Sequence, residues 1–144
     1  AYDYQDNTFH SHPGYYIDYF EMRLAQLQVL HNLHYEIKKI RKMPKQALVI
    51  ADYIMYMADY VVEMNIPDQQ IEKLEEISEQ MKQEELPKTR DEFEGRALLY
   101  HILMDLEEFL VYKKRFVNGL DEKKLRIYWN QEMEQKDREN ELQE

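Results

Sequence analysis

The chain has 144 residues, no cysteine and a formal net charge of −10 at pH 7. Without cysteine it has no disulfides or thiolate metal sites, and its negative charge disfavours nucleic acid and anionic lipid surfaces as partners. Glycine (3 residues) and proline (4 residues) are too scarce for a turn-rich β fold, so the composition predicts one helical domain.

The first 14 residues are polar and aromatic and end in His12-Pro13-Gly14. Because Pro-Gly interrupts regular structure, residues 1–14 are predicted to be a leader or linker. A first helix is expected from about Tyr15 to Lys42. Its apolar residues recur every three or four positions, which predicts the buried face: Ile17, Phe20, Leu24, Leu27, Leu30, Leu33, Ile37 and Ile40.

A second helix is expected over residues 44–65, with Pro44 as its first residue. Its central stretch, residues 47–64, is apolar on nearly every side. The length would suit a short membrane span, but Asp52 and Asp59 would each be costly at the bilayer centre. We therefore interpret this stretch as a buried helix around which the other helices pack.

The third helix is expected over residues 68–85, with a narrow apolar face formed by Ile71, Leu74, Ile77 and Met81. Thr89 followed by Glu92 fits a capping box that opens the fourth helix. That helix is expected to end at Asn118, with Gly119 as a left-handed stop.

A fifth helix is expected from about Asp121, with Leu125, Tyr128, Trp129 and Met133 as its apolar residues. Residues 134–144 have almost no apolar surface and are predicted to be a polar tail. The predicted fold is therefore all-α, an antiparallel up-and-down bundle of four to five helices over residues 15–133.

Two histidine patterns offer chemistry, and neither matches an established motif. His31 and His34 share a helix face and could bind a metal ion with help from a neighbouring carboxylate, or hydrogen bond locally. His101 and Asp105, one turn apart, could be a general base with its orienting carboxylate, or a surface pair. No nucleophile lies near either pair in sequence, so we predict no catalytic activity, no metal site and no cofactor.

Tyrosine is unusually frequent, with 12 residues. Tyrosine rings combine apolar area with one polar group, which suits the wall of a pocket for a small aromatic molecule, although such stripes more often serve packing. The hypothetical ligand-binding set is His31, His34, Tyr53, Tyr56, Tyr60 and Tyr100.

Basic residues cluster near the end of the first helix and in the first turn of the second: Lys38, Lys39, Arg41, Lys42 and Lys45. Positive charge at a helix C-terminus complements the helix dipole. The alternative is that the cluster contacts an acidic partner or a membrane surface.

Two segments resemble a known family. HPGYYIDYFEMRLAQLQVL (residues 12–30) and LPKTRDEFEGRALLYHILMDLEEFLVYKKRFV (residues 86–117) are similar to the C-terminal domain of the putative aromatic acid exporter family of Gram-positive bacteria. The resemblance covers roughly residues 10–120 and rests on overall pattern, so it transfers no functional residue.

The resemblance implies a soluble all-helical domain that follows transmembrane helices in the same chain. The function expected from it is a cytoplasmic accessory domain, regulatory or assembly, of a membrane transporter for aromatic acids. The partner expected is the membrane-embedded part of the same chain, and the sequence leaves open whether the domain also pairs with a second copy of the chain. The alternatives are a bundle that senses a small aromatic ligand and a metal-binding bundle.

Overall fold

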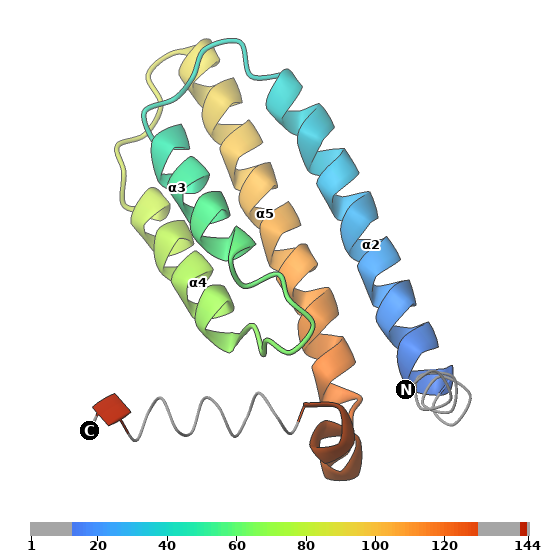
Figure 1. Cartoon of the computed structure of the whole chain (residues 1–144). Coiled ribbons are helices and arrows are strands. Elements are labelled where there is room, and N and C mark those ends of the chain that lie inside the picture. The colour runs from blue at the N-terminus through green and yellow to red at the C-terminus, as the bar shows by residue number, and fades with distance from the viewer. Residues whose placement is uncertain (1–12, 130–141, 144) are drawn as a thin grey trace.

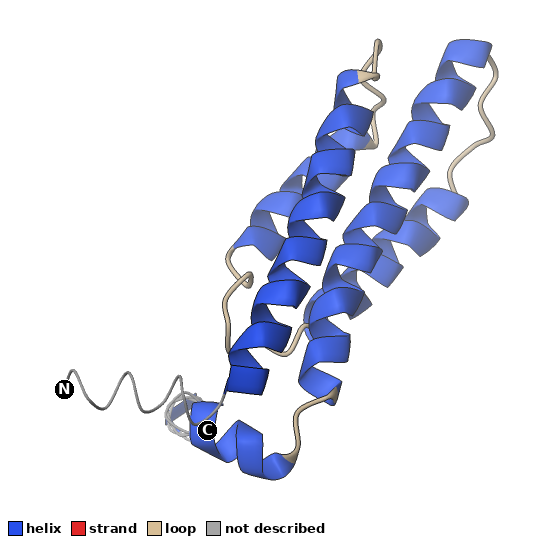
Figure 2. Ribbon diagram, turned by 90° about the vertical axis from the view of Figure 1, so that its right-hand side faces the viewer, coloured by secondary structure: helices blue, strands red, loops and turns tan. Residues whose placement is uncertain are grey.

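The chain forms a bundle of helices that alternate in direction (Figure 1). The computed structural model describes residues 13–129, 142 and 143, and no strand occurs among them (Figure 2). The bundle consists of α2 (Pro13–Lys38), α3 (Ala47–Ala58), α4 (Asp68–Lys82) and α5 (Arg90–Asn118). A shorter helix, residues 122–129, follows α5. The predicted all-α, up-and-down bundle is confirmed.

Some of the predicted boundaries fall outside the described residues. The expected leader at residues 1–14 is described only at its last two positions, where α2 has already begun at Pro13. The expected tail at residues 134–144 is described only at residues 142 and 143, and Met133 is not described.

The centre of the bundle is α5. This helix buries apolar side chains along its whole length, and α2, α3 and α4 all pack against it. The sequence predicts a run of apolar residues along this helix, and six of the seven are almost fully buried: Leu99, Ile102, Leu103, Leu106, Leu110 and Phe116. The seventh, Leu98, is partly buried. Because one helix supplies a surface to three others, its stripe is the common surface of the hydrophobic core.

The prediction that residues 47–64 form a central helix buried on all sides is wrong. In α3 only Ile50, Tyr53 and Met57 are buried, and Leu48 and Met55 are largely exposed. This helix lies at the side of the bundle and presents one face to α4 and α5.

The second helix is also shorter than expected at both ends, since it begins at Ala47 and ends at Ala58. Beyond it, the ammonium of Lys113 on α5 donates hydrogen bonds of 2.7 Å to the carbonyl oxygens of Val62 and Glu63. Because these two carbonyl oxygens accept hydrogen bonds from another helix, they do not require the hydrogen bonds that a longer α3 would supply.

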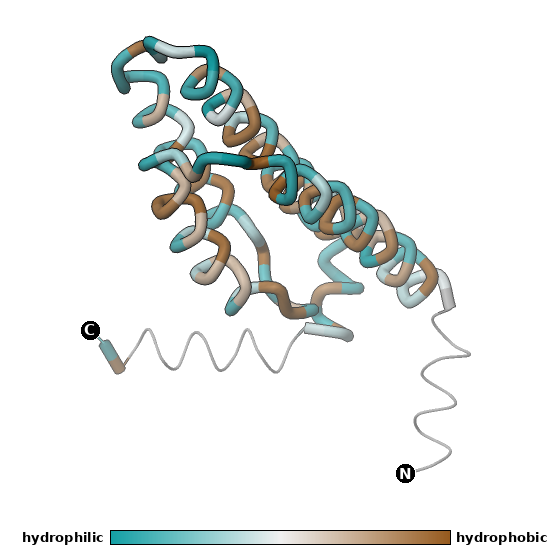
Figure 3. Tube along the Cα trace, turned by 90° about the horizontal axis from the view of Figure 1, so that it is seen from above, coloured by the Kyte–Doolittle hydropathy of each residue, from teal (hydrophilic) through white to brown (hydrophobic). Residues whose placement is uncertain are grey.

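The predicted buried face of the first helix is also wrong. Of its eight residues only Leu33 is buried, while Ile17, Phe20, Leu24, Leu27, Leu30 and Ile37 are exposed and Ile40 is partly buried. The buried face instead consists of Tyr15, Met22, Gln26, Val29 and Leu33. Hydrophobic residues recur along all of α2, the helix that leads to the N-terminus in Figure 3.

A hydrogen bond explains why α2 turns this second face inward. The amide nitrogen of Gln26 donates to the backbone carbonyl oxygen of Phe109 on α5 at 2.8 Å, and both residues are buried. Apolar area is available on two faces of the helix, so the face that also satisfies polar groups of α5 is favoured.

The other helix ends largely match the sequence. In α4 the face of Ile71, Leu74, Ile77 and Met81 packs on the core, although the helix ends at Lys82 and not at Glu85. The cap of α5 is confirmed, because the hydroxyl of Thr89 accepts a hydrogen bond from the backbone N–H of Glu92 at 3.1 Å.

Two end predictions are wrong. Gly119 does not adopt a left-handed conformation: its φ is −78°, and its N–H closes the last turn of α5. The first helix ends at Lys38 and not at Lys42, and its last turn is closed by the N–H of Ile40 donating to the carbonyl oxygen of Ile37.

The α2–α3 connection approaches α5 closely at Gly95. A Cβ at this position would lie 3.0 Å from Cγ of Pro44 and 3.8 Å from the carbonyl oxygen of Lys42. Pro44, predicted to open the second helix, instead lies in the connection and packs on this glycine.

We expect Gly95→Val to destabilise the fold by about 1–3 kcal/mol, because a branched side chain overpacks this contact. Urea denaturation followed by circular dichroism measures the change. The matched control is Ala97→Val, since Ala97 lies on the same helix and is exposed. Equal free energies of unfolding for the two variants would contradict the close contact.

Candidate functional site

Three tyrosines of the hypothetical ligand set form a ladder along α3 and the turn that follows it. Successive ring centroids of Tyr53, Tyr56 and Tyr60 lie 5.9 Å and 5.1 Å apart. The hydroxyl of Tyr53 donates to the backbone carbonyl oxygen of Gln70 on α4 at 2.6 Å. Burial raises the pKa of the Tyr53 phenol above its ordinary value, so the hydroxyl is a neutral donor at physiological pH.

The ladder packs against α4 along most of its length. Lys73 places its ammonium 3.9 Å from the ring centroid of Tyr56, and the side-chain amide of Asn65 donates to Gln70 at 3.0 Å. The cavity that Tyr60 helps to line holds about 10 Å³, which is the space of one water molecule. In this arrangement the ladder joins α3 to α4.

The other members of the hypothetical set lie elsewhere. His31 and His34 are exposed on α2, and the ring of His31 contacts Tyr35 edge-on at 5.0 Å. Tyr100 is partly buried on α5 and packs on the main core. The six residues are therefore distributed over α2, α3, the turn after α3 and α5, and ring contacts join Tyr53, Tyr56 and Tyr60.

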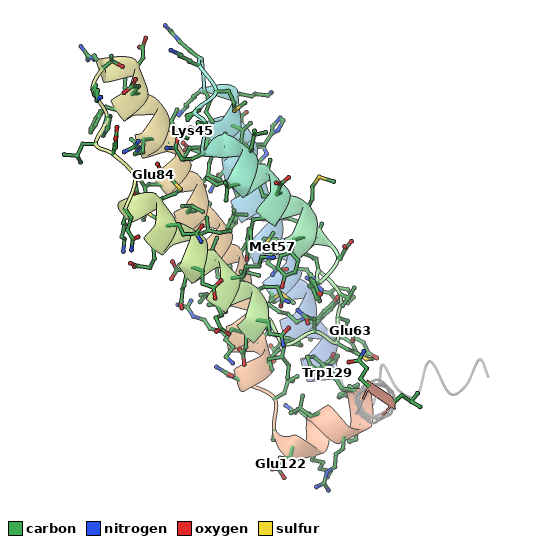
Figure 4. The ribbon with its side chains drawn as sticks, turned by 90° about the vertical axis from the view of Figure 1, so that its left-hand side faces the viewer. Lys45, Met57, Glu63, Glu84, Glu122 and Trp129 are labelled. Atoms are coloured by element: carbon green, nitrogen blue, oxygen red, sulfur yellow. The ribbon has the colours of Figure 1, made fainter. Side chains whose placement is uncertain are left out.

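A concave surface lies at the end of the bundle where the α2–α3 and α4–α5 connections meet. It is an open cleft of about 620 Å³, large enough for a small aromatic molecule. Lys45 and Glu84, which both line it, lie at this end in Figure 4, and Glu63 and Trp129 lie at the opposite end. Two members of the basic cluster seen in the sequence, Lys42 and Lys45, face this cleft.

The cleft combines apolar and charged walls. Met43, Pro44 and Leu86 supply apolar surface. The four basic residues at its wall are matched by four acidic ones: Lys42, Lys45, Lys88 and Arg96 against Glu84, Glu85, Asp91 and Glu92. Such a wall can hold a ligand with an apolar ring and a charged group, but it does not strongly prefer an anion.

Several of these charges already have partners, and Lys88 and Glu85 form an ion pair of 4.0 Å. The carboxylate of Glu92 accepts a hydrogen bond of 2.8 Å from the backbone N–H of Lys88, which lowers the pKa of Glu92. Arg96 donates to the backbone carbonyl oxygen of Glu85. Lys42 and Lys45 are exposed.

A second polar cluster lies between α2 and α5. The Nε2 atom of His101 is 3.4 Å from Oε1 of Glu36 and 3.8 Å from Oδ2 of Asp105. Oδ2 of Asp105 is buried and has no hydrogen-bond partner among the described residues. Burial raises the pKa of Asp105, and Glu36 adds to this effect, while His101 opposes it.

The structure thus brings His101 and Asp105 together as the sequence indicated and adds Glu36 from α2. The adjoining groove of about 470 Å³ has no serine or threonine among the described residues that line it, and besides Glu36 and His101 its lining consists of Lys39, Phe93, Glu94, Ala97 and Leu98. Within the described part of the chain, no group of three or more side chains could hold a metal ion.

The opposite end of the bundle is closed by an aromatic cluster. The indole N–H of Trp129 donates to the hydroxyl of Tyr15 at 3.1 Å, and that hydroxyl donates to Glu63 at 2.8 Å. The ring of Tyr15 also stacks on Tyr128 at 3.9 Å between centroids. Burial raises the pKa of Tyr15 above its ordinary value, so its hydroxyl remains protonated.

This cluster ties three distant segments together: the first turn of α2, the α3–α4 connection and the helix at residues 122–129. Lys113 belongs to it as well, because its ammonium lies 5.7 Å from the ring centroid of Trp129. Sequence reasoning places Lys113, together with Lys114 and Arg115, in a second basic set near a helix end. The signal it missed is that Lys113 continues the spacing of the buried stripe after Leu106 and Leu110.

Comparison with known proteins identifies the family. A model described as "Putative aromatic acid exporter C-terminal domain" matches residues 1–114. The chain belongs to this family. A relative from Bacillus subtilis (strain 168), "Uncharacterized protein YqjA", is 31% identical over 98 residues, which cover 68% of this chain and 30% of the relative. No solved structure matches the chain significantly.

The family resemblance expected from the sequence is therefore confirmed, and with it an association with transport. The matched part of this chain spans less than a third of the length of YqjA. Among the helices of residues 13–129 and 142–143, none combines the length and the apolar character required to cross a membrane.

We expect Asp105→Asn to stabilise the protein at pH 7, because the raised pKa means that folding disfavours the Asp105 carboxylate. A gain of ~1 kcal/mol in the free energy of unfolding would raise the thermal midpoint by roughly 2–4 °C. The gain shrinks as the pH falls toward the ordinary aspartate value, where folded and unfolded chains both carry the proton.

Thermal unfolding between pH 4 and pH 7 measures this gain, with Glu107→Gln as the control because Glu107 is exposed on the same helix. A loss of stability in Asp105→Asn at pH 7 would show that the carboxylate is needed in its charged form.

Proposed function

We propose that this chain is a cytoplasmic accessory domain of a membrane transporter for aromatic acids, with a regulatory or assembly role and no catalytic activity of its own. The observation that carries the proposal is the family match over residues 1–114. The partner is the membrane-embedded part of the same protein, which precedes this domain.

The arrangement at the start of α2 supports a coupling role. In the proposed protein the membrane part connects to this domain through the residues ahead of α2, and α2 is the helix that Tyr15 links to Glu63 and Trp129. A displacement of the first turn of α2 would therefore also displace the α3–α4 connection and residues 122–129. Buried hydrogen bonds of this kind transmit movement because breaking them leaves polar groups unsatisfied.

In the full-length transporter, deletion of residues 1–144 is expected to lower the efflux of a benzoic acid at unchanged membrane abundance. Tyr15→Phe is expected to lower efflux more than Tyr35→Phe does, because Tyr35 is exposed on the same helix and lies outside the cluster. Radiolabelled acid retained by cells measures efflux, and immunoblotting of membranes measures abundance.

Unchanged efflux after deletion would contradict the accessory role. Conversion of aromatic acids by the purified domain, followed by mass spectrometry, would contradict the absence of catalysis.

The second candidate function is sensing of a small aromatic ligand, which the 620 Å³ cleft favours because it pairs apolar surface with exposed lysines. The tyrosine ladder of Tyr53, Tyr56 and Tyr60 is the other location proposed for such a ligand. The remaining members of the predicted set, His31, His34 and Tyr100, lie apart from it. The two locations can be separated because they lie on different parts of the bundle.

If the cleft binds, benzoic acids at millimolar concentration raise the thermal midpoint of the domain, since a ligand that binds the native state stabilises it. The rise is lost in Lys42→Gln/Lys45→Gln and retained in Tyr60→Phe. The opposite pattern assigns the ligand to the tyrosine ladder, and a midpoint that does not move counts against sensing of these acids.

A further inference from the structure

The helix at residues 122–129 buries very little of its own surface. Among these residues only Trp129 is buried, with 2% of its surface exposed, while Leu125 and Tyr128 are partly buried. The helix has its own N-terminal cap, because the carboxylate of Asp121 accepts a hydrogen bond of 2.7 Å from the backbone N–H of Lys124. A separately capped helix with so few buried apolar contacts opens more readily than the core of a bundle.

The ring of Trp129 lies in a seat that the bundle provides. Trp129 belongs to a buried cluster with Tyr15 and Met22 of α2 and with Phe116 and Val117 of α5. This cluster is separate from the main core of the bundle, and it lies at the end where Trp129 is labelled in Figure 4. The main core therefore does not depend on the indole ring.

The hydroxyl of Tyr15 determines which edge a ring in this seat must present. It donates to Oε1 of Glu63 at 2.8 Å, since a carboxylate can only accept. The oxygen of Tyr15 is then the acceptor for the indole N–H of Trp129, at 3.1 Å. Because burial raises the pKa of Tyr15, its proton is retained. The seat thus fits a ring with an N–H at its edge and disfavours a ring with an acceptor there.

The seat also presents a cation to the ring. The ammonium of Lys113 lies 5.7 Å from the ring centroid of Trp129, within the range of attraction between a cation and an aromatic face. The same ammonium is held by the carbonyl oxygens of Val62 and Glu63. These bonds and the bond from Tyr15 to Glu63 lie within the bundle, so these polar groups stay paired when the short helix moves away.

We propose that residues 122–129 form a latch over a binding site for a planar aromatic ring that carries an N–H group, such as indole. In the closed chain Trp129 fills this site, and a ligand of this class enters it when the latch opens. The proposal does not depend on the transport function of the family.

The variant Trp129→Ala, made in the whole chain, tests the site. Because the chain has one tryptophan, the fluorescence of added indole then reports only its own binding. Indole at millimolar concentration is expected to shift its emission to shorter wavelength and to raise the thermal midpoint of this variant. If Trp129→Ala does not fold, Trp129→Leu replaces it with the same expected result, since leucine leaves a smaller cavity. The absence of both shifts in a variant with intact helical circular dichroism overturns the proposal.

Benzofuran, in which an oxygen replaces the N–H of indole, tests the role of Tyr15. In Trp129→Ala it is expected to bind about 3- to 10-fold more weakly than indole, because one hydrogen bond is lost. Competition with indole measures its affinity. The difference is expected to vanish in Trp129→Ala/Tyr15→Phe and to persist in the matched control Trp129→Ala/Tyr35→Phe, since Tyr35 is exposed on the same helix. Equal affinities in Trp129→Ala, or a difference that survives Tyr15→Phe, overturns this site.

Fluorine NMR of the unmodified chain, with a fluorinated tryptophan incorporated at its one tryptophan position, tests the latch. Excess indole is expected to move the fluorine signal toward its position in the unfolded chain, because indole displaces Trp129 from the seat. Benzofuran at the same concentration is the control and is expected to move the signal less. A signal that stays in place at an indole concentration that saturates Trp129→Ala overturns the latch.

Discussion

The bundle depends on the burial of α5. This helix provides the common surface against which α2, α3 and α4 pack, and its apolar stripe from Leu99 to Val117 is nearly continuous. Removal of this surface from water is the main favourable term in folding a domain of this size. The shorter helices α3 and α4 expose much of their length and are placed by α5 and by each other.

A small number of buried polar groups decide how the helices are oriented on α5. Gln26 selects the inward face of α2, Lys113 holds the α3–α4 connection, and Gln70 joins α4 to Tyr53. Each of these groups would be costly to bury without its partner, so each excludes alternative packings of similar apolar area. Asp105 differs because one of its buried oxygens has no hydrogen-bond partner among the described residues.

The two ends of the bundle have different characters. At one end an open, mixed-charge cleft lies between the connections, where loops often carry binding functions. At the other end Tyr15, Glu63 and Trp129 form a closed hydrogen-bonded cluster around the start of α2. Under the proposed accessory role, the end closed by Tyr15, Glu63 and Trp129 is the one that contacts the rest of the protein. The end with the open cleft is the one accessible to small molecules.

The sequence by itself determined the fold class, the number and order of the helices, the cap at Thr89 and the buried faces of α4 and α5, because local spacing and capping chemistry specify these features directly. It also contained the family resemblance. It did not identify the central helix, since the strongly apolar stretch after Ala47 predicts a central helix and the structure places it at the side of the bundle.

Only the tertiary structure decided which apolar face of α2 is buried and where α3 ends. Hydrophobic spacing predicts that a face is apolar, but when a helix has two such faces the choice depends on polar partners from distant segments, such as Phe109 for Gln26 and the α3–α4 connection for Lys113. These partners are 83 and about 50 residues away in the chain, beyond the reach of any local pattern.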